Sequence, residues 1–170
     1  MSLYDMEQWK RYPIPVGFNL VRDTREWQLP LFMNPPDDLV IIDEMLKQGD
    51  YSFVGYENLV TIERKYTDFF AYVGSERQKK TIPKLEVMST YLWAALAIEG
   101  DPFKIPPQSH QPKKGGKRLT KKSVRDFLKS VRVHYGIHVF WGNRYEVEIF
   151  VLDHLVYCYN HFEKLRKKAG

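Results

Sequence analysis

Short apolar runs recur along the chain, and each is bounded by glycine, proline or polar turn residues. Alternating or continuous apolar positions predict six strands, at residues 18–22, 39–42, 51–54, 59–65, 94–99 and 137–141. The turn residues Gly55-Tyr56-Glu57-Asn58 separate the third strand from the fourth, which predicts a hairpin.

Between these strands, apolar residues three or four positions apart predict helices. Asp68 can cap the first helix and Thr120 the third, because a short polar side chain accepts a hydrogen bond from the first turn. Gly136 is expected to end the third helix. Strands and helices that alternate in this way predict an α/β layer fold with a mixed sheet. The apolar helix positions are Phe69, Phe70, Tyr72 and Val73, then Leu85, Met88 and Leu92, then Val124, Phe127, Leu128 and Val131.

The longest predicted helix covers residues 144–168 and carries two apolar stripes. A helix that covers one sheet needs a single stripe. The second stripe therefore predicts another partner, which is either a neighbouring helix or a second subunit. The first stripe contains Tyr145, Ile149, Leu152, Val156 and Tyr159, and the second contains Val147, Val151, Leu155, Cys158, Phe162 and Leu165.

The chain of 170 residues is long enough for one domain with a full hydrophobic core. Residues 1–17 are expected to form an extension that Trp9 and Tyr12 anchor, and residues 18–170 to form the domain. Within the domain, residues 101–119 are rich in proline, lysine and glycine, which predicts a flexible basic loop.

No apolar run is long enough to cross a bilayer, and residues 1–10 lack the features of a secretory signal. The single cysteine, Cys158, excludes an internal disulfide. We therefore expect an intracellular protein that is not secreted. It would lie in the cytoplasm of a prokaryotic or virus-infected cell, or in a nucleus.

The net charge of +5 is unevenly distributed along the chain. Residues 101–132 hold ten Lys and Arg side chains against two Asp, whereas the rest of the chain is slightly acidic. A basic strip beside an acidic region suits a polyanionic substrate such as DNA. The alternative is a solvated linker followed by an exposed helix face. The predicted DNA-binding residues are Lys113, Lys114, Lys117, Arg118, Lys121 and Lys122.

The strongest candidate chemistry lies on the predicted hairpin, in Gly49-Asp50-Tyr51 and Glu63-Arg64-Lys65. In an extended strand, residues two positions apart share a face, so Glu63 and Lys65 project together while Arg64 points away. Asp50 and Glu63 can then hold a divalent cation between them, with Lys65 beside it. The alternative is a structural ion pair, since carboxylates and a lysine on buried strands also pair with one another.

Two further acids, Asp23 and Glu26, follow the first predicted strand. Because they lie at a strand end, they can contribute carboxylates to the same site. Hard cations such as Mg²⁺ take oxygen ligands, and water completes the shell.

These motifs, in this order, resemble the nuclease domain of XPF-type structure-specific endonucleases over residues 18–168. The central signature of that family is similar to Gly49-Asp50 followed by Glu63-Arg64-Lys65. The other matching segments are Val21-Arg22-Asp23-Thr24-Arg25-Glu26, Arg77, Met88-Ser89-Thr90-Tyr91, Ala97-Ile98-Glu99-Gly100, residues 123–128 and Tyr135-Gly136-Ile137.

The resemblance implies a restriction-endonuclease-like fold, with three layers (α/β/α) around a central mixed sheet, and cleavage of DNA with Mg²⁺ or Mn²⁺. On matching positions, Asp50 and Glu63 would be metal ligands, with the Arg64 carbonyl as a third. Asp23 and Glu26 would complete the acidic cluster, Lys65 would assist catalysis and Arg64 would support the site. Only two residues separate Lys65 from Asp68, where the family has three, so Asp68 is expected to be a helix cap.

The resemblance also implies branched or flap DNA as substrate, in repair, recombination or replication, and a homodimer through the C-terminal helical region. One alternative is a non-catalytic DNA-binding or scaffold subunit of a nuclease complex, since some members of the family keep the fold without the site. Another is an RNA-processing or nucleotide-hydrolysing enzyme with the same metal site.

Overall fold

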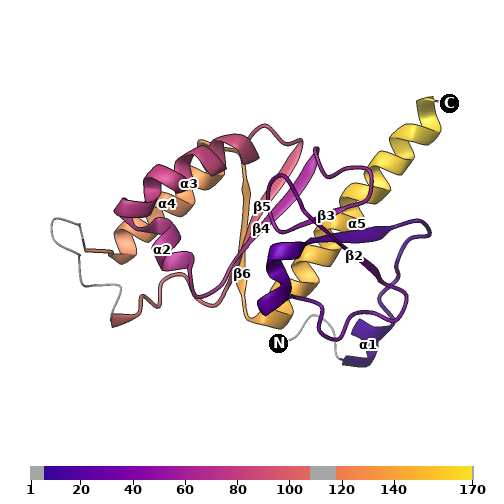
Figure 1. Cartoon of the computed structure of the whole chain (residues 1–170), viewed down its shortest axis with the longest axis horizontal. Helices are drawn as coiled ribbons and strands as arrows, with labels where there is room; N and C mark the ends of the chain where they lie inside the picture. The colour runs from indigo at the N-terminus through magenta and orange to yellow at the C-terminus, as the bar shows by residue number, and fades with distance from the viewer. Residues whose placement is uncertain (1–5, 108–117, 170) are drawn as a thin grey trace.

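The computed structural model describes residues 6–107 and 118–169, and its centre is one six-stranded sheet (Figure 1). The strand order is β2-β1-β3-β4-β5-β6. Strand β3 runs antiparallel to β1 and β4, and the remaining neighbours are parallel, so the sheet is mixed as predicted. All six predicted strands are present. Their bounds are β1 (Asn19–Asp23), β2 (Val40–Glu44), β3 (Tyr51–Phe53), β4 (Val60–Lys65), β5 (Trp93–Glu99) and β6 (His138–Gly142).

Helices cover both faces of this sheet and complete the three layers (Figure 1). Strand β5 shows why, because its residues alternate between two cores: Ala95 and Ala97 face α5, whereas Leu96 packs with α2, α3 and α4. No helix of the described chain is long and apolar enough to span a membrane. The helices are α1 (Met6–Lys10), η1 (Thr24–Gln28, a 3₁₀ helix), α2 (Phe69–Val73), α3 (Ser75–Met88), α4 (Lys121–Val133) and α5 (Arg144–Ala169).

The predicted helix ends are partly confirmed. Thr120 accepts a hydrogen bond from the Ser123 amide, and the Ser123 hydroxyl accepts one from the Thr120 amide, so this cap of α4 is correct. Asp68 is the N-cap residue of α2, as predicted, but its side chain makes no capping hydrogen bond. Its carboxylate lies 3.4 Å from the Lys65 ammonium instead. Helix α3 ends at Met88, and Leu92 lies beyond it, 59% exposed.

The N-terminal part of the chain supplies the partner that the additional stripe of α5 requires. Trp9 stacks edge-on against Tyr145, with 5.9 Å between the ring centroids, and Phe18 does the same against Tyr159 at 5.5 Å. The Tyr12 hydroxyl donates to Asp153 Oδ1 at 2.5 Å. Both stripes therefore lie mainly in one core within the chain. The partner is an N-terminal segment that includes the short helix α1, so the two stripes by themselves require no second subunit.

Candidate active site

Three carboxylates lie side by side on neighbouring strands at one end of the sheet. The pairing of Arg22 with Tyr51 and of Tyr51 with Ile62 places Asp23 opposite Asp50, and Asp50 opposite Glu63. Backbone hydrogen bonds of 2.8 Å, from Asp23 to Asp50 and from Asp50 to Ile62, fix this register. Residues opposite each other share a face, so Asp23, Asp50 and Glu63 form a row.

Gly49 allows β3 to enter this row so close to β4. Its φ is +79°, a left-handed conformation that favours glycine. A Cβ atom at this position would lie 2.0 Å from Thr61 Oγ1 and 3.0 Å from the Ile62 carbonyl. The glycine of the Gly49-Asp50 pair is therefore required by packing, and it places Asp50 opposite Glu63.

Glu63 is fully buried, at 0% exposure, as is Asp23. Its Oε1 atom lies 2.6 Å from the Lys65 ammonium and 2.6 Å from the Lys84 ammonium. Its Oε2 atom is buried and has no hydrogen-bond partner among the described residues. A buried carboxylate oxygen without a partner is costly, so this atom is available to a ligand such as a metal ion.

Asp50 faces the same space as Glu63, and one of its oxygens is held by the backbone. Asp50 Oδ2 accepts a hydrogen bond of 2.7 Å from the Arg64 amide. Burial, with the charge of Glu63 next to it, raises the pKa of the Asp50 carboxyl to about 8. A buried carboxyl whose ionisation is disfavoured, next to a second carboxylate, provides a favourable place for a divalent cation.

Lys65 is fixed beside these carboxylates, as predicted from its spacing. Burial opposes its charge, but Glu63, Asp50 and Asp68 outweigh that effect and raise the pKa of the ammonium, which stays protonated. The ammonium also lies 5.1 Å from the centroid of the Tyr72 ring, so it is held from a second side.

Asp23 lies in the row, but its oxygens are already engaged. Arg25 binds both of them through Nε at 2.6 Å and Nη2 at 2.8 Å, and the amides of Arg25 and Leu46 donate at 2.7 and 2.8 Å. Burial opposes ionisation, yet these hydrogen bonds hold the pKa of Asp23 below its ordinary value. A role for Asp23 as a metal ligand therefore requires Arg25 to move away.

Arg64 points to the opposite face of β4, towards α5, as the strand spacing predicts. Its guanidinium donates to Glu26 Oε2 at 2.7 Å, to Glu99 Oε1 at 2.6 Å and to the Leu29 carbonyl at 2.6 Å. Glu26 also accepts from the Tyr51 hydroxyl at 3.1 Å. Glu26 is thus committed to Arg64 and not placed as a fourth member of the carboxylate row.

A third acid besides Glu26 and Glu99, Glu148 of α5, lies near Arg64. Burial raises the pKa of its carboxyl to about 7, against the opposing influence of Arg144. Glu148 and Lys84 could not be singled out as site residues from the sequence, because no motif contains them, whereas Glu99 belongs to the matching segment Ala97-Ile98-Glu99-Gly100 but had no predicted role. Only the packing of α5, β5 and α3 against β4 brings them to the site.

The residues of the row fit a cation with few protein ligands. In residues 6–107 and 118–169, no group of three or more His, Cys, Asp or Glu side chains is arranged around one metal position. Asp50 and the free Oε2 of Glu63 supply two oxygen donors, which suits an ion such as Mg²⁺ that keeps several waters. The Arg64 carbonyl stays a prediction as a third donor.

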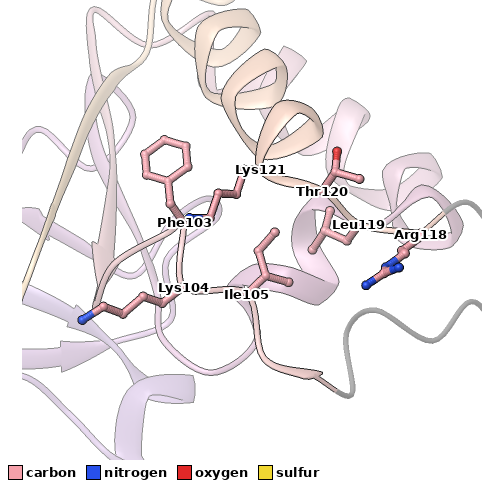
Figure 2. A pocket seen from close by; sticks show the side chains of 7 residues that line it. All are labelled: Phe103, Lys104, Ile105, Arg118, Leu119, Thr120 and Lys121. Carbon is pink, nitrogen blue, oxygen red and sulfur yellow. The ribbon is translucent and has the colours of Figure 1, made fainter.

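Part of the predicted DNA-binding surface lines a groove at the start of α4 (Figure 2). This groove has a volume of about 520 Å³, and the cationic side chains of Lys104, Arg118 and Lys121 line it together with the apolar Ile105 and Leu119. Lys122 lies outside it and pairs with Asp126 at 2.6 Å. The remaining predicted residues, Lys113, Lys114 and Lys117, lie outside the described residues.

A second groove connects this region with the end of β4. Its lining includes Tyr66 and Thr67, which follow Lys65 directly, and Lys104, which also lines the first groove. The basic groove therefore shares Lys104 with a groove that reaches the residues directly after Lys65.

The mixed six-stranded sheet, with helices on both faces and acids at the strand ends, is a restriction-endonuclease-like fold. Two solved structures of XPF from Aeropyrum pernix share it. One has a TM-score of 0.59 at 18% identity over 81% of this chain, and the other, a complex with DNA, has a TM-score of 0.60 at 19% identity over 85%. This chain covers 59% and 66% of those two chains.

No family model matches the sequence, and no curated protein does. The fold predicted from the sequence resemblance is confirmed by the structural similarity to XPF. At this level of identity the similarity shows the fold, so the activity, substrate and partners have to be inferred from the site residues.

Proposed function

We propose that this chain is a metal-dependent endonuclease that hydrolyses phosphodiester bonds of DNA, with Mg²⁺ or Mn²⁺ as cofactor. The observation that carries the proposal is the pair formed by Asp50 and Glu63, in which Glu63 Oε2 is buried without a partner among the described residues. The similarity to an XPF structure in complex with DNA supports DNA as the substrate class.

The residues of the row have distinct roles in this reaction. Asp50 and Glu63 would hold the cation, with the Arg64 carbonyl as a third donor. The chemistry that a cation would supply there is polarisation of the scissile phosphate and a lower pKa of a bound water. Lys65, fixed at 2.6 Å from Glu63, orients the attacking water or stabilises the negative charge that develops on the phosphate.

Arg64 and Glu26 act away from the reacting atoms. Arg64 donates to Glu26 of η1 and Glu99 of β5 and so holds these two elements against β4 at the end where the carboxylates lie. The register between Asp50 and Glu63 depends on this end of the sheet, so Arg64 is a positioning residue.

The basic groove would hold the DNA backbone beside the site. Lys104, Arg118 and Lys121 contact phosphates, with Lys113, Lys114, Lys117 and Lys122 as further candidates. Contacts to phosphates release counterions, so binding weakens steeply as the salt concentration rises. Phosphate contacts do not distinguish one base sequence from another, which suits an enzyme that selects DNA by shape. Branched or flap DNA in repair, recombination or replication is the substrate that we propose.

The test is cleavage of labelled flap, fork, single-stranded and duplex DNA, with Mg²⁺ or with EDTA. We expect cleavage with Mg²⁺ and none with EDTA, Asp50→Ala or Glu63→Ala. The matched control is Glu86→Gln, which removes an exposed acid from α3 outside the site. Cleavage that survives Asp50→Ala would overturn the site assignment, and preferential cleavage of RNA would overturn the substrate class.

The competing candidate is a non-catalytic DNA-binding or scaffold subunit of a nuclease complex. The observation that favours it is the pairing of the acids: Arg25 engages both oxygens of Asp23, and two lysines contact Glu63 Oε1. A wild-type protein that binds DNA without cutting any substrate in Mg²⁺ or Mn²⁺ would support this alternative.

We also propose a homodimer through the C-terminal helical region. Its support is a groove of about 480 Å³ where the edge strand β6 meets α5, lined by Phe140, Phe150 and Tyr157. Phe140 and Phe150 stack at 4.5 Å, and Tyr157 is 67% exposed. Sedimentation should show a dimer that Tyr157→Asp weakens and Lys164→Asp, on the same helix, does not. A wild-type monomer at high concentration would contradict the dimer.

A further inference from the structure

Lys84 lies on α3, outside every motif of the sequence, and its side chain contacts the carboxylate of Glu63. Its ammonium lies 2.6 Å from Glu63 Oε1, the atom that Lys65 also contacts at 2.6 Å. Two ammonium groups therefore share one carboxylate oxygen, while the other oxygen of the same carboxylate is buried without a partner among the described residues.

The two lysines are held very differently. Lys65 is 12% exposed, lies 3.4 Å from Asp68 Oδ2 and contacts the Tyr72 ring. Lys84 is 33% exposed, and Glu63 is its one ion-pair partner among the described residues. Of the two, Lys84 is the one whose side chain can turn towards solvent at little cost.

Charge balance determines which group moves when a cation arrives. Asp50 and Glu63 carry two negative charges when ionised, and Lys65 and Lys84 carry two positive ones. A divalent cation adds two positive charges within a few ångströms, and like charges at that distance repel strongly where water is largely excluded. The ammonium with the fewest other contacts is the one that moves.

We propose that Lys84 and a divalent cation compete for Glu63, and that the displaced Lys84 ammonium binds a phosphate of the DNA beside the site. The second half of this inference rests on the proposed function, and the first half does not. In the absence of cation, Lys84 then pairs with the Glu63 carboxylate. In its presence, the same side chain becomes a substrate contact.

The first test is a Mn²⁺ titration followed by the electron paramagnetic resonance signal of free Mn²⁺. It compares wild type with Lys84→Met and Lys84→Arg, and uses Lys79→Met as the control, because Lys79 is an exposed lysine of the same helix. Loss of a competing positive charge should tighten Mn²⁺ binding about 3- to 10-fold in Lys84→Met. Lys84→Arg and Lys79→Met should bind Mn²⁺ like wild type. Unchanged or weaker binding in Lys84→Met would overturn the competition.

The second test is DNA cleavage by the same variants at saturating Mn²⁺. Loss of a phosphate contact should slow Lys84→Met about 10- to 100-fold, although it binds the metal more tightly. Lys84→Arg should retain most of the rate, since it keeps the charge. A merely structural role would weaken metal binding and cleavage together. Thermal unfolding, with Lys84→Gln as a second variant, checks that the fold is intact.

Full activity of Lys84→Met at saturating Mn²⁺ would overturn the phosphate contact. A wild-type protein that cuts no DNA would overturn the proposed function and this contact with it. The Mn²⁺ titration would then still decide whether Lys84 and the cation compete.

Discussion

The two faces of β4 differ in how the charged residue of the strand itself is paired: Arg64 lies on the paired face and Glu63 on the unpaired face. Glu148 of α5, near the paired face, also keeps a buried oxygen without a hydrogen-bond partner among the described residues, so the difference concerns the residues of β4. On the face towards α5, the Arg64 guanidinium donates to Glu26, Glu99 and a backbone carbonyl. On the face towards α2 and α3, Glu63 keeps one buried oxygen without a partner among the described residues, and Asp50 has a raised pKa beside it. The adjacent residues Arg64 and Glu63 thus differ in role: Arg64, on the paired face, stabilises the fold, and Glu63, on the unpaired face, is suited to bind a ligand.

The variant Asp50→Asn tests the unpaired face, and its expected effect is the largest. The amide keeps an oxygen to accept the Arg64 hydrogen bond, but it removes a charge that a cation needs. We expect cleavage to fall about 1,000-fold or more. Thermal stability should be unchanged or higher, because the carboxyl that burial and Glu63 disfavour is gone.

The control for this variant is Asp38→Asn, an exposed acid outside the site. A clear loss of melting temperature in Asp50→Asn would contradict the assignment of Asp50 to the unpaired face, since it would make this carboxylate a structural group.

Arg64→Met tests the paired face. It leaves the carboxylates of Glu26 and Glu99 without their guanidinium partner, and breaking a buried pair in this way costs about 3–5 kcal/mol. Urea denaturation should show this loss in the free energy of unfolding. A loss comparable to that of an exposed arginine, such as Arg166→Met, would show that the paired face contributes little.

The pH dependence of stability separates the two faces again. Without metal, the pKa of the folded Asp50 carboxyl is raised to about 8, so the folded state binds more protons than the unfolded state between pH 4 and 8. The stability that protonated Asp50 contributes is therefore present at low pH and is lost as pH rises to about 8. The contribution of Asp50 should therefore lower the melting temperature in EDTA as the pH rises over this range.

Asp50→Asn should flatten the part of this fall that extends to pH 8. Glu148→Gln should flatten the part that ends near pH 7, because burial raises the pKa of Glu148 to about 7. If the melting curves of Asp50→Asn and wild type run parallel from pH 5 to 8, the pKa of the folded Asp50 carboxyl is not raised.

The smallest expected effect concerns the basic groove. Replacing Arg118 and Lys121 by Ala removes two phosphate contacts, so DNA affinity should fall about 3- to 30-fold and the salt dependence should become shallower. The control is the pair Lys167→Ala and Lys168→Ala at the end of α5, which changes the net charge equally. Equal losses in both double variants, measured by fluorescence anisotropy, would indicate a general charge effect and not a groove.

The strands and the central acids could be predicted from the sequence, because period-two alternation and a Gly-Asp turn are local signals. The sheet register then follows from the hairpin, so Asp50 and Glu63 meet as expected. Lys84 could not be predicted, since its role depends on where α3 packs across β4. The local sequence of α3 does not encode that placement.

Two further placements could not be predicted from the sequence, for similar reasons. Glu26 follows Asp23 by three residues, and the 3₁₀ helix η1 turns it towards Arg64 and away from the row. The two stripes of α5 predicted either a helix or a second subunit as the additional partner. In the structure, two of the aromatic residues that pack there, Tyr12 and Phe18, lie outside any helix. Long-range contacts of aromatic residues in an irregular segment leave no periodic signal in the sequence.

Mn²⁺ binding to wild type and to Asp50→Asn tests whether Asp50 and Glu63 hold a divalent cation. Electron paramagnetic resonance of free Mn²⁺ measures this binding in the absence of any substrate. We predict a bound ion in wild type and in Glu86→Gln, and loss of that ion in Asp50→Asn and in Glu63→Gln. Equal Mn²⁺ binding by wild type and Asp50→Asn would show that Asp50 is not a ligand of the cation.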